Sequence, residues 1–191
     1  MIRFVDSILA VLCLIIFSPL LLVCAIAIRM EDGLPVIYSQ ERIGLHGKPF
    51  MIYKFRSMRM NAEEDGAPLL LEKKGDNRLT HVGRFLRRHH LDELPQLWNV
   101  LKGDMAFIGP RPERKYYIDQ IIEQDPRYVY LYQIRPGVTS YATLYNGYTD
   151  SIEKMIRRLD LDLYYMEHRS VWLDTKILAK TFINITFGKV F

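Results

Sequence analysis

Residues 91–112 read LDELPQLWNVLKGDMAFIGPRP and contain a short helix between two turn signals. Proline is tolerated only in the first turn of a helix, so Pro95 marks its beginning, and Gly103 supplies a C-terminal stop. The residues between them predict one apolar face, formed by Leu97, Trp98, Val100 and Leu101. The pattern therefore predicts a helix with two adjacent carboxylates, Asp92 and Glu93, at its start.

Asp92 and Glu93 admit two interpretations. The unpaired N–H groups and positive dipole end of a helix start suit phosphate, and a carboxylate there stays ionised and could attack a phosphate or hold a metal. Asp is also a preferred N-cap and Glu is common in the first turn, so both carboxylates could simply cap the helix. The helix pattern alone leaves both interpretations open.

Arginines flank the carboxylate pair on both sides. Arg84, Arg87 and Arg88 precede it, and Arg111 follows between two prolines, whose restricted backbone fixes the direction of its side chain. Arginine forks match phosphate oxygens in a bidentate way. The three upstream arginines could equally form a solvated helix face. Their density around the carboxylates favours a phosphate site.

Length and composition indicate one catalytic unit. A chain of 191 residues with 49% hydrophobic content can form one compact domain plus a membrane segment, and is too short for two ordinary domains. The net charge of +4 suits anionic lipid headgroups, phosphorylated substrates or nucleic acid. Zinc-finger spacing, RNA-binding signatures and a basic zipper are missing from the sequence, so we expect no nucleic-acid partner.

Residues 7–28 carry no charged side chain and would extend about 33 Å as an unbroken helix at 1.5 Å per residue. Pro19 lies in the middle, where it removes a backbone donor and clashes with the carbonyl one turn back, near Ile15. Ser18 could donate a hydrogen bond to a freed carbonyl, which would stabilise a bent helix in lipid. We therefore expect a kink at Ser18-Pro19.

Three topologies are compatible with this segment: a straight or mildly kinked span, a re-entrant helix, or a cleaved signal peptide. Ala25-Ile26-Ala27 resembles a cleavage site, but the long apolar region and the acidic Asp6 oppose a signal peptide. Basic residues lie on both flanks, at Arg3 and Arg29, so the positive-inside rule does not favour opposite sides. This balance favours the re-entrant helix.

The rest of the chain predicts an α+β fold with more helix than strand. Residues 35–39 and 50–55 are short β-rich runs bounded by Gly and Pro, which predicts a hairpin. Residues 61–77 are rich in charge and predict a surface loop. Helices are expected over 82–89 and over 113–124, the second ending before a proline.

Two further segments could contact a membrane. Residues 170–188 combine many large apolar side chains with Lys176 and Lys180, which suits a helix at a lipid interface or an ordinary amphipathic helix against the core. Tyrosines gather around residues 135–137, where they could lie at a headgroup boundary, stack on a base or pack in the core. They are Tyr128, Tyr130, Tyr132, Tyr141, Tyr145 and Tyr148.

The sequence resembles one known family, the bacterial sugar transferases called monotopic phosphoglycosyl transferases. The resemblance covers residues 91–112 almost without gaps and nearly the whole chain. It extends to KFRSM at residues 54–58, RPGVT at 135–139, LDLYYMEHRSVWLDTKI at 161–177 and the Ser18-Pro19 pair. It implies transfer of a phosphosugar from a UDP-sugar to a polyprenol phosphate such as undecaprenyl phosphate, with release of UMP, at the start of surface glycan assembly.

The resemblance also implies roles for the carboxylates. Asp92 would attack the phosphate that bears the sugar and form a covalent phosphosugar ester, which polyprenol phosphate then takes up in a second displacement. Two neighbouring carboxylates repel a diphosphate, so a divalent cation, Mg2+, is expected to bridge them. Glu93, with Asp92, is the expected metal ligand.

Cationic side chains complete the expected site. Arg87, Arg88 and Arg111 would neutralise charge on the phosphates, and Arg135 in RPGVT would join them in binding phosphate or nucleotide. Lys54 and Arg56 in KFRSM lie next to the membrane segment and are expected to meet the lipid phosphate; basic residues that snorkel near a membrane are the alternative. All six residues lie within or close to the quoted motifs.

The architecture implied by the resemblance has two parts. Residues 1–30 would form a membrane-inserted re-entrant helix broken at Ser18-Pro19, with both ends cytoplasmic. Residues 31–191 would form a compact catalytic domain with interfacial amphipathic helices, on the cytoplasmic face of the bacterial inner membrane, in contact with the lipid bilayer. The sequence leaves open whether the chain forms a homodimer.

Two departures from the family pattern limit what can be carried over. His89 and His90 stand where a small hydroxyl residue is more usual, and residues 140–143 replace a Gly and a Gln that often follow RPGVT. The sugar, the polyprenol length and the glycan pathway are not fixed by the sequence. Two other functions stay open: a membrane-bound glycosyltransferase that releases UDP, and a non-catalytic scaffold of a glycan assembly complex.

Overall fold

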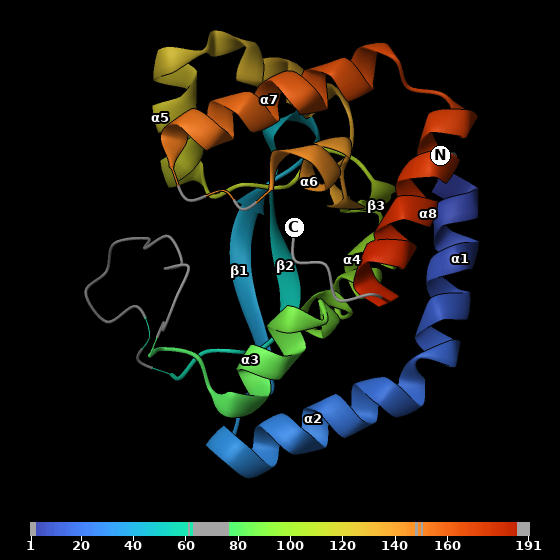
Figure 1. Ribbon diagram of the computed structural model, residues 1–191, viewed down its shortest axis with the longest axis vertical. Helices are drawn as coiled ribbons and strands as arrows, with labels where there is room; N and C mark the ends of the chain where they lie inside the picture. The colour runs from blue at the N-terminus through green and yellow to red at the C-terminus, as the bar shows by residue number, and fades with distance from the viewer. Residues whose placement is uncertain (1–2, 61, 63–76, 148, 150, 187–191) are drawn as a thin grey trace.

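The computed structural model shows a helix-rich α+β fold built around two small sheets (Figure 1). It describes residues 3–60, 62, 77–147, 149 and 151–186. The expected helix-rich α+β class is therefore confirmed. Most of the surface loop expected over residues 61–77, together with Tyr148 and residues 187–188 of the C-terminal segment, lies outside the described residues.

The N-terminal apolar segment forms two helices, α1 (Arg3–Ile16) and α2 (Ser18–Asp32), which are bent by 61° at the break between them. The Ser18 hydroxyl donates a hydrogen bond of 2.8 Å to the carbonyl of Ile15, one of the carbonyls that Pro19 leaves without a backbone donor. The predicted kink is confirmed. Neither helix alone is long and apolar enough to cross a membrane, and among the described residues only this bent pair reaches the length and hydropathy of a span.

Each half of the pair packs on the remainder of the chain along one side only. In α1, Ala10 is buried beside Val100 of the segment quoted above; in α2, Cys24 and Ile28 are buried beside Leu86. The opposite sides expose large apolar side chains, at Phe4, Ile8, Leu12, Ile15, Ile16, Leu22, Val23, Ile26 and Met30 among others. An exposed apolar surface of this extent is typical of a protein or membrane contact.

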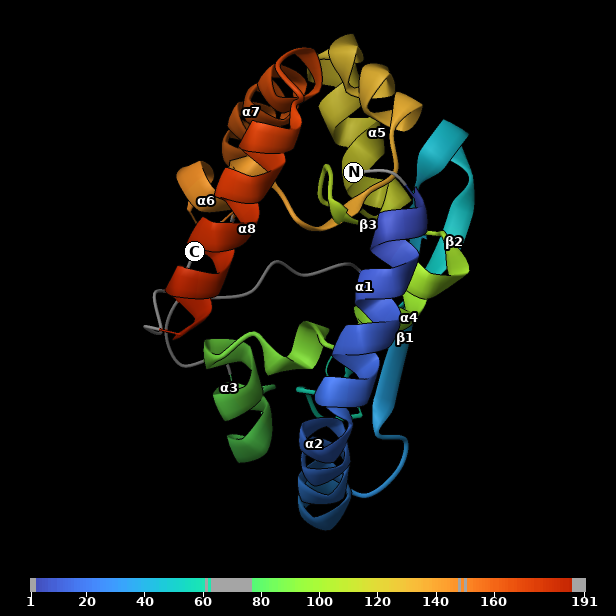
Figure 2. The same cartoon turned by 90° about the vertical axis from the view of Figure 1, so that its right-hand side faces the viewer.

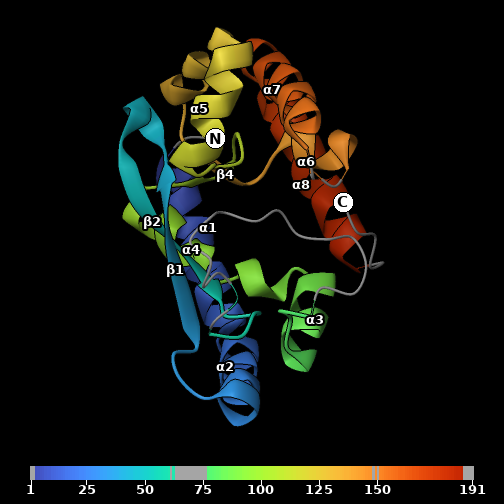
Figure 3. The same cartoon turned by 90° about the vertical axis from the view of Figure 1, so that its left-hand side faces the viewer.

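The predicted hairpin is present. Strands β1 (Ile37–Ile43) and β2 (Pro49–Phe55) pair antiparallel in the register Ile37 with Phe55, joined through a 3-10 turn (Leu45–Gly47). Figure 3 shows the hairpin running from α2 at its lower end toward α5 at its upper end. Ile52 and Phe55 face inward and are 4% exposed each, so β2 is anchored in two core clusters.

The segment after the hairpin folds as α3 (His81–Arg88), a 3-10 turn (Leu91–Glu93) and α4 (Gln96–Lys102). Helix α3 confirms the prediction within one residue, and α4 ends at Gly103, which has a left-handed φ of 90°. The expectation that the carboxylates begin α4 was wrong. They lie in the separate 3-10 turn, because His90 adopts a left-handed φ of 54° and Pro95 begins the next helix.

The second sheet pairs β3 (Ala106–Ile108) with β4 (Gly137–Thr139) in parallel, and its crossover contains α5 (Lys115–Gln124) and a 3-10 helix (Pro126–Gln133). Helix α5 begins two residues later than expected and ends where predicted, before Pro126. Tyr128 is buried with α5 and α7 residues in the largest core cluster, so core packing accounts for this tyrosine.

Three C-terminal helices cover the second sheet: α6 (Tyr141–Asn146), α7 (Ile152–Glu167) and α8 (Val171–Thr186). Figure 2 shows α7 and α8 on one side of the molecule and the hairpin on the other. Helix α8 buries Ile177 and exposes Val171, Trp172, Phe182 and Ile183. It is thus apolar on the core side and on the outside, which is compatible with both readings of this segment.

Candidate active site

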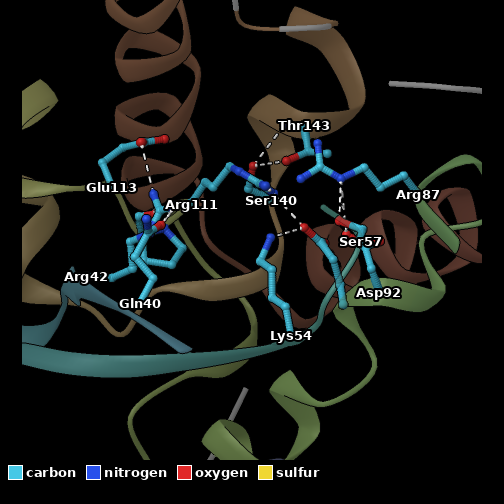
Figure 4. A network of polar contacts seen from close by, with 12 residues as sticks. Gln40, Arg42, Lys54, Ser57, Arg87, Asp92, Arg111, Glu113, Ser140 and Thr143 are labelled. Atoms are coloured by element: carbon cyan, nitrogen blue, oxygen red, sulfur yellow. Dashed lines mark hydrogen bonds and ion pairs between the residues drawn. The ribbon is translucent and has the colours of Figure 1, made fainter. Parts of the chain in front are cut away.

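The structure brings both carboxylates together with three of the expected cations. Figure 4 shows Asp92 with these cations, Lys54, Arg87 and Arg111. Lys54 comes from β2, Arg87 from α3, and Arg111 from the proline-flanked loop after β3, while Asp92 and Glu93 lie in the 3-10 turn. Four segments that are distant in the sequence thus meet at one place. The site exists only in the folded chain.

Glu93 is held by two cations. Its Oε1 accepts hydrogen bonds from Lys54 Nζ at 2.7 Å and from Arg111 Nη2 at 3.1 Å. Burial by itself raises the pKa of Glu93, but the charges of Lys54 and Arg111 outweigh it and hold the pKa well below its usual range. Glu93 is therefore an ionised carboxylate with a fixed orientation.

Asp92 is buried, but no close hydrogen bond fixes its carboxylate within the described residues. Its nearest ionic partner is Arg87, with Nε 4.0 Å from Oδ2, and within the described part of the chain its carboxylate accepts no hydrogen bond. Burial raises the pKa of Asp92, and the neighbouring charge of Glu93 raises it further. Since no described backbone N–H donates to either carboxylate, neither of them caps α4.

The loop that carries Arg111 is fixed by buried charges that the sequence did not reveal. Arg42 Nη1 donates to the carbonyl of Pro112 at 3.2 Å and to Glu113, which also pairs with Arg158. The backbone N–H of Arg111 donates to Asp162, which is 2% exposed. Glu113 and Asp162 were missed because each acts through residues far away in the sequence; only the proline-locked arginine hinted at such a support.

Three other predicted cations lie elsewhere. Arg56 is 5% exposed, and its Nη2 donates to the carbonyls of Asp32 and Gly33 at 2.7 and 3.0 Å, at the end of α2. Arg135 Nε donates to the carbonyl of Gly103 at 3.0 Å, at the far end of α4 from the carboxylates. Arg88 is exposed on α3. For Arg56 and Arg135 the structure gives a structural partner, and a ligand role for either stays a prediction.

The departures from the family pattern have local structural roles. The His89 ring packs against the Phe85 ring in a tilted arrangement, with the ring centroids 4.4 Å apart, and His89 Nδ1 lies 2.9 Å from the carbonyl oxygen of Phe85. Ser140 is the N-cap of α6, since its Oγ accepts the backbone N–H of Thr143 at 2.8 Å. These contacts stabilise the ends of two helices that border the site.

The donor set suits a shared Mg2+ ion. The described residues contain no group of three or more His, Cys, Asp or Glu that could hold a metal by themselves. Mg2+ is commonly bound through one or two carboxylates plus substrate phosphates, and Asp92 and Glu93 supply such a pair. Glu93 Oε1 already carries two cations, so Glu93 Oε2 and the Asp92 carboxylate are the oxygens that fit the ion.

A carboxylate pair surrounded by cations, in a chain that also carries a bent apolar helix pair, defines a candidate phosphoryl-transfer site. Residues 1–188 match the family model described as bacterial sugar transferase, and the chain belongs to this family. The expected resemblance is thereby confirmed.

Three relatives are similar to this chain over most of its length. The chain is 41% identical over 186 residues to a UDP-N-acetylgalactosamine-undecaprenyl-phosphate N-acetylgalactosaminephosphotransferase of Aeromonas hydrophila. It is 42% and 40% identical to UDP-glucose:undecaprenyl-phosphate glucose-1-phosphate transferases of Caulobacter vibrioides and Escherichia coli. These matches cover 97%, 94% and 92% of this chain but 44%, 67% and 38% of the relatives. The chain thus spans about half the length of these relatives.

Proposed function

We propose that this protein transfers a phosphosugar from a UDP-sugar to undecaprenyl phosphate and releases UMP, through a covalent Asp92 intermediate. Family membership and the names of the relatives support the overall reaction. The site supports it independently, because it offers two carboxylates of different character among cations that suit a diphosphate.

The observation that carries the assignment of the nucleophile is the contrast between Asp92 and Glu93. A nucleophilic carboxylate must be able to turn toward the phosphorus that it attacks, and hydrogen bonds from the protein restrict that movement. Glu93 Oε1 is bonded twice, whereas the Asp92 carboxylate accepts no hydrogen bond within the described residues.

Two displacements complete the reaction. An Asp92 oxygen forms a bond to the phosphorus that bears the sugar, the bond from that phosphorus to the bridging oxygen breaks, and UMP leaves with the electron pair. A phosphate oxygen of undecaprenyl phosphate then attacks the same phosphorus, and the bond to Asp92 breaks. The carboxylate is regenerated, and the product is an undecaprenyl diphosphosugar.

The cations each have a task in this scheme. Arg111 and Lys54 hold Glu93 and bring positive charge to the side of Glu93 that faces the loop after β3. Arg87 lies on the side of Asp92 and can neutralise the phosphate under attack. A bound Mg2+ would supply further neutralisation of the diphosphate, with Asp92 and Glu93 as its protein ligands.

The α1–α2 pair is proposed to be re-entrant, with both ends on the cytoplasmic face of the inner membrane. Its beginning is tied to the catalytic domain by Phe107, whose N–H donates to Asp6 at 3.5 Å, and its end by Arg56, which pairs with Asp32 at 3.3 Å. Since one domain holds both ends, the ends are on one side of the bilayer. The exposed apolar side chains between them would lie in lipid.

The test is turnover of the full chain in lipid nanodiscs with a panel of UDP-sugars, undecaprenyl phosphate and Mg2+. Release of UMP is expected with at least one donor, and none after chelation with EDTA until Mg2+ is restored. Release of UDP would indicate transfer of the sugar alone, and no product with any donor would support a non-catalytic scaffold. Either result overturns the proposal.

The intermediate is tested without the lipid acceptor. A donor with a radiolabelled sugar is expected to label the wild-type chain covalently, and Asp92→Asn is expected to abolish this labelling. Asp119→Asn, on the exposed surface of α5, is the matched control and should label as the wild type does. Labelling that persists in Asp92→Asn would place the nucleophile at another residue.

A further inference from the structure

Helix α3 rests on one residue of the segment after β2, Ser57, which is 5% exposed. The carbonyl of Ser57 accepts the backbone N–H of Thr80 at 3.2 Å, just before α3 begins. Gly83 lies so close to the same carbonyl that a Cβ at this position would be 2.0 Å from it. The backbone of Ser57 thus docks the helix, and only glycine at position 83 permits so close an approach.

The side chain of Ser57 makes a separate contact. Its Oγ accepts a hydrogen bond of 2.8 Å from Arg87 Nε, which itself lies 4.0 Å from Asp92 Oδ2 (Figure 4). A flexible arginine side chain loses rotamer entropy when a ligand orders it, so a fixed acceptor at Nε lowers the ordering cost that the ligand must offset. Within the described residues the Nη groups of Arg87 make no hydrogen bond, which leaves them available for a ligand.

We propose that Ser57 is a positioning residue for phosphoryl transfer: its hydroxyl holds Arg87 at Nε and so directs the Nη groups toward the phosphate that Asp92 attacks. This inference rests on the proposed function. It separates two tasks within one residue, because the backbone carbonyl docks α3 while the hydroxyl orients Arg87. The hydroxyl can therefore be removed without removing the docking contact.

The experiment is a double-mutant cycle on the rate of covalent labelling by the UDP-sugar donor in nanodiscs. Ser57→Ala is expected to lower this rate roughly ten-fold, as the loss of one hydrogen bond to a charged group would. Arg87→Ala should lower it at least as much. The double variant should be no slower than Arg87→Ala alone, because Ser57 acts only through Arg87.

Thr80→Ala is the matched control, since it removes the N-cap of α3, where Thr80 Oγ1 accepts the N–H of Gly83 at 2.9 Å, and leaves the contact between Ser57 and Arg87 intact. It should lower the melting temperature and leave the labelling rate of the folded chain unchanged, because Arg87 keeps its acceptor at Ser57. Should Ser57→Ala not fold, Ser57→Cys keeps the side-chain volume with a weaker acceptor and should show the same non-additivity.

The possible failures are distinct. A wild-type chain that releases no UMP refutes the proposed function itself. An active wild type with a Ser57→Ala variant that labels at the same rate, or whose loss adds in full to that of Arg87→Ala, refutes the positioning role alone. A slow Ser57→Ala variant whose substitution causes no further loss of rate in the Arg87→Ala background supports it.

Discussion

Asp162 provides a test of the buried network behind Arg111. Its carboxylate lies in α7 at 2% exposure, and burial raises its pKa to about 7, although Arg158 and hydrogen bonds from Ala142, Ser140 and the backbone of Arg111 act in the opposite direction. The unfolded chain releases the same proton near pH 4. Between these values the folded state binds more protons than the unfolded state.

The sign of the pH dependence follows from this difference. Stability falls with rising pH wherever the folded state binds more protons, so the contribution of Asp162 is present at acidic pH and is lost as pH rises through about 7. From pH 5.5 to pH 8 the loss is about 2 kcal/mol by the linkage relation. In a domain of this size that corresponds to a fall in melting temperature of about 4–8 °C.

Thermal unfolding in detergent at constant ionic strength measures this effect. The melting temperature of the wild type should fall between pH 5.5 and pH 8 by that amount more than that of Asp162→Asn, in which the group no longer titrates. Asp160→Asn is the control. Asp160 precedes Asp162 by two residues in α7, but its side chain is exposed and pairs with Arg127 at 2.7 Å. If wild type and Asp162→Asn give parallel curves, the carboxylate does not carry a proton in the folded state.

Three further perturbations follow from single contacts. Lys54→Met should lower UMP release about 10- to 100-fold, since it removes one of the two cations on Glu93, whereas Lys115→Met on the exposed face of α5 should leave the rate unchanged. Arg56→Met removes the buried cation at the end of α2 and should cost about 3 kcal/mol of stability; an unchanged melting temperature would contradict this. Pro19→Leu restores a backbone donor and should reduce the 61° bend, seen as a longer distance between spin labels at the two ends of the helix pair.

Features set by local chemistry were predictable from the sequence. The bend at Pro19, the hydrogen bond from Ser18 to a freed carbonyl, and the glycine stop at Gly103 each depend on residues within one helical turn. The hairpin and α3 likewise follow from short patterns of apolar and turn residues. The start of α4 was misplaced because the left-handed backbone of His90, which isolates the carboxylate turn, has no such local signal.

The partners of the charged residues could not be predicted, because they depend on tertiary contacts. Lys54 and Arg56 are two residues apart and were expected to share a ligand, but β2 ends at Phe55 between them. Lys54 therefore points to Glu93, and Arg56 turns to the end of α2. Closeness in sequence led us to expect a shared ligand for Lys54 and Arg56. The end of β2 at Phe55 instead sends the two side chains in different directions.

The four residues 54–57 connect the bent helix pair α1–α2 to the site. Lys54 binds Glu93, Arg56 caps α2, and Ser57 holds both α3 and Arg87. A displacement of α2 relative to the domain therefore strains the same short segment that places two cations at the carboxylates. Because these four residues are covalently consecutive, the seating of the bent helix pair and the charge arrangement around Asp92 cannot vary independently. In the proposed reaction the acceptor is a lipid phosphate, which must reach the carboxylate of Asp92. The linkage through residues 54–57 keeps this carboxylate at a fixed distance from the exposed apolar surface of α1 and α2.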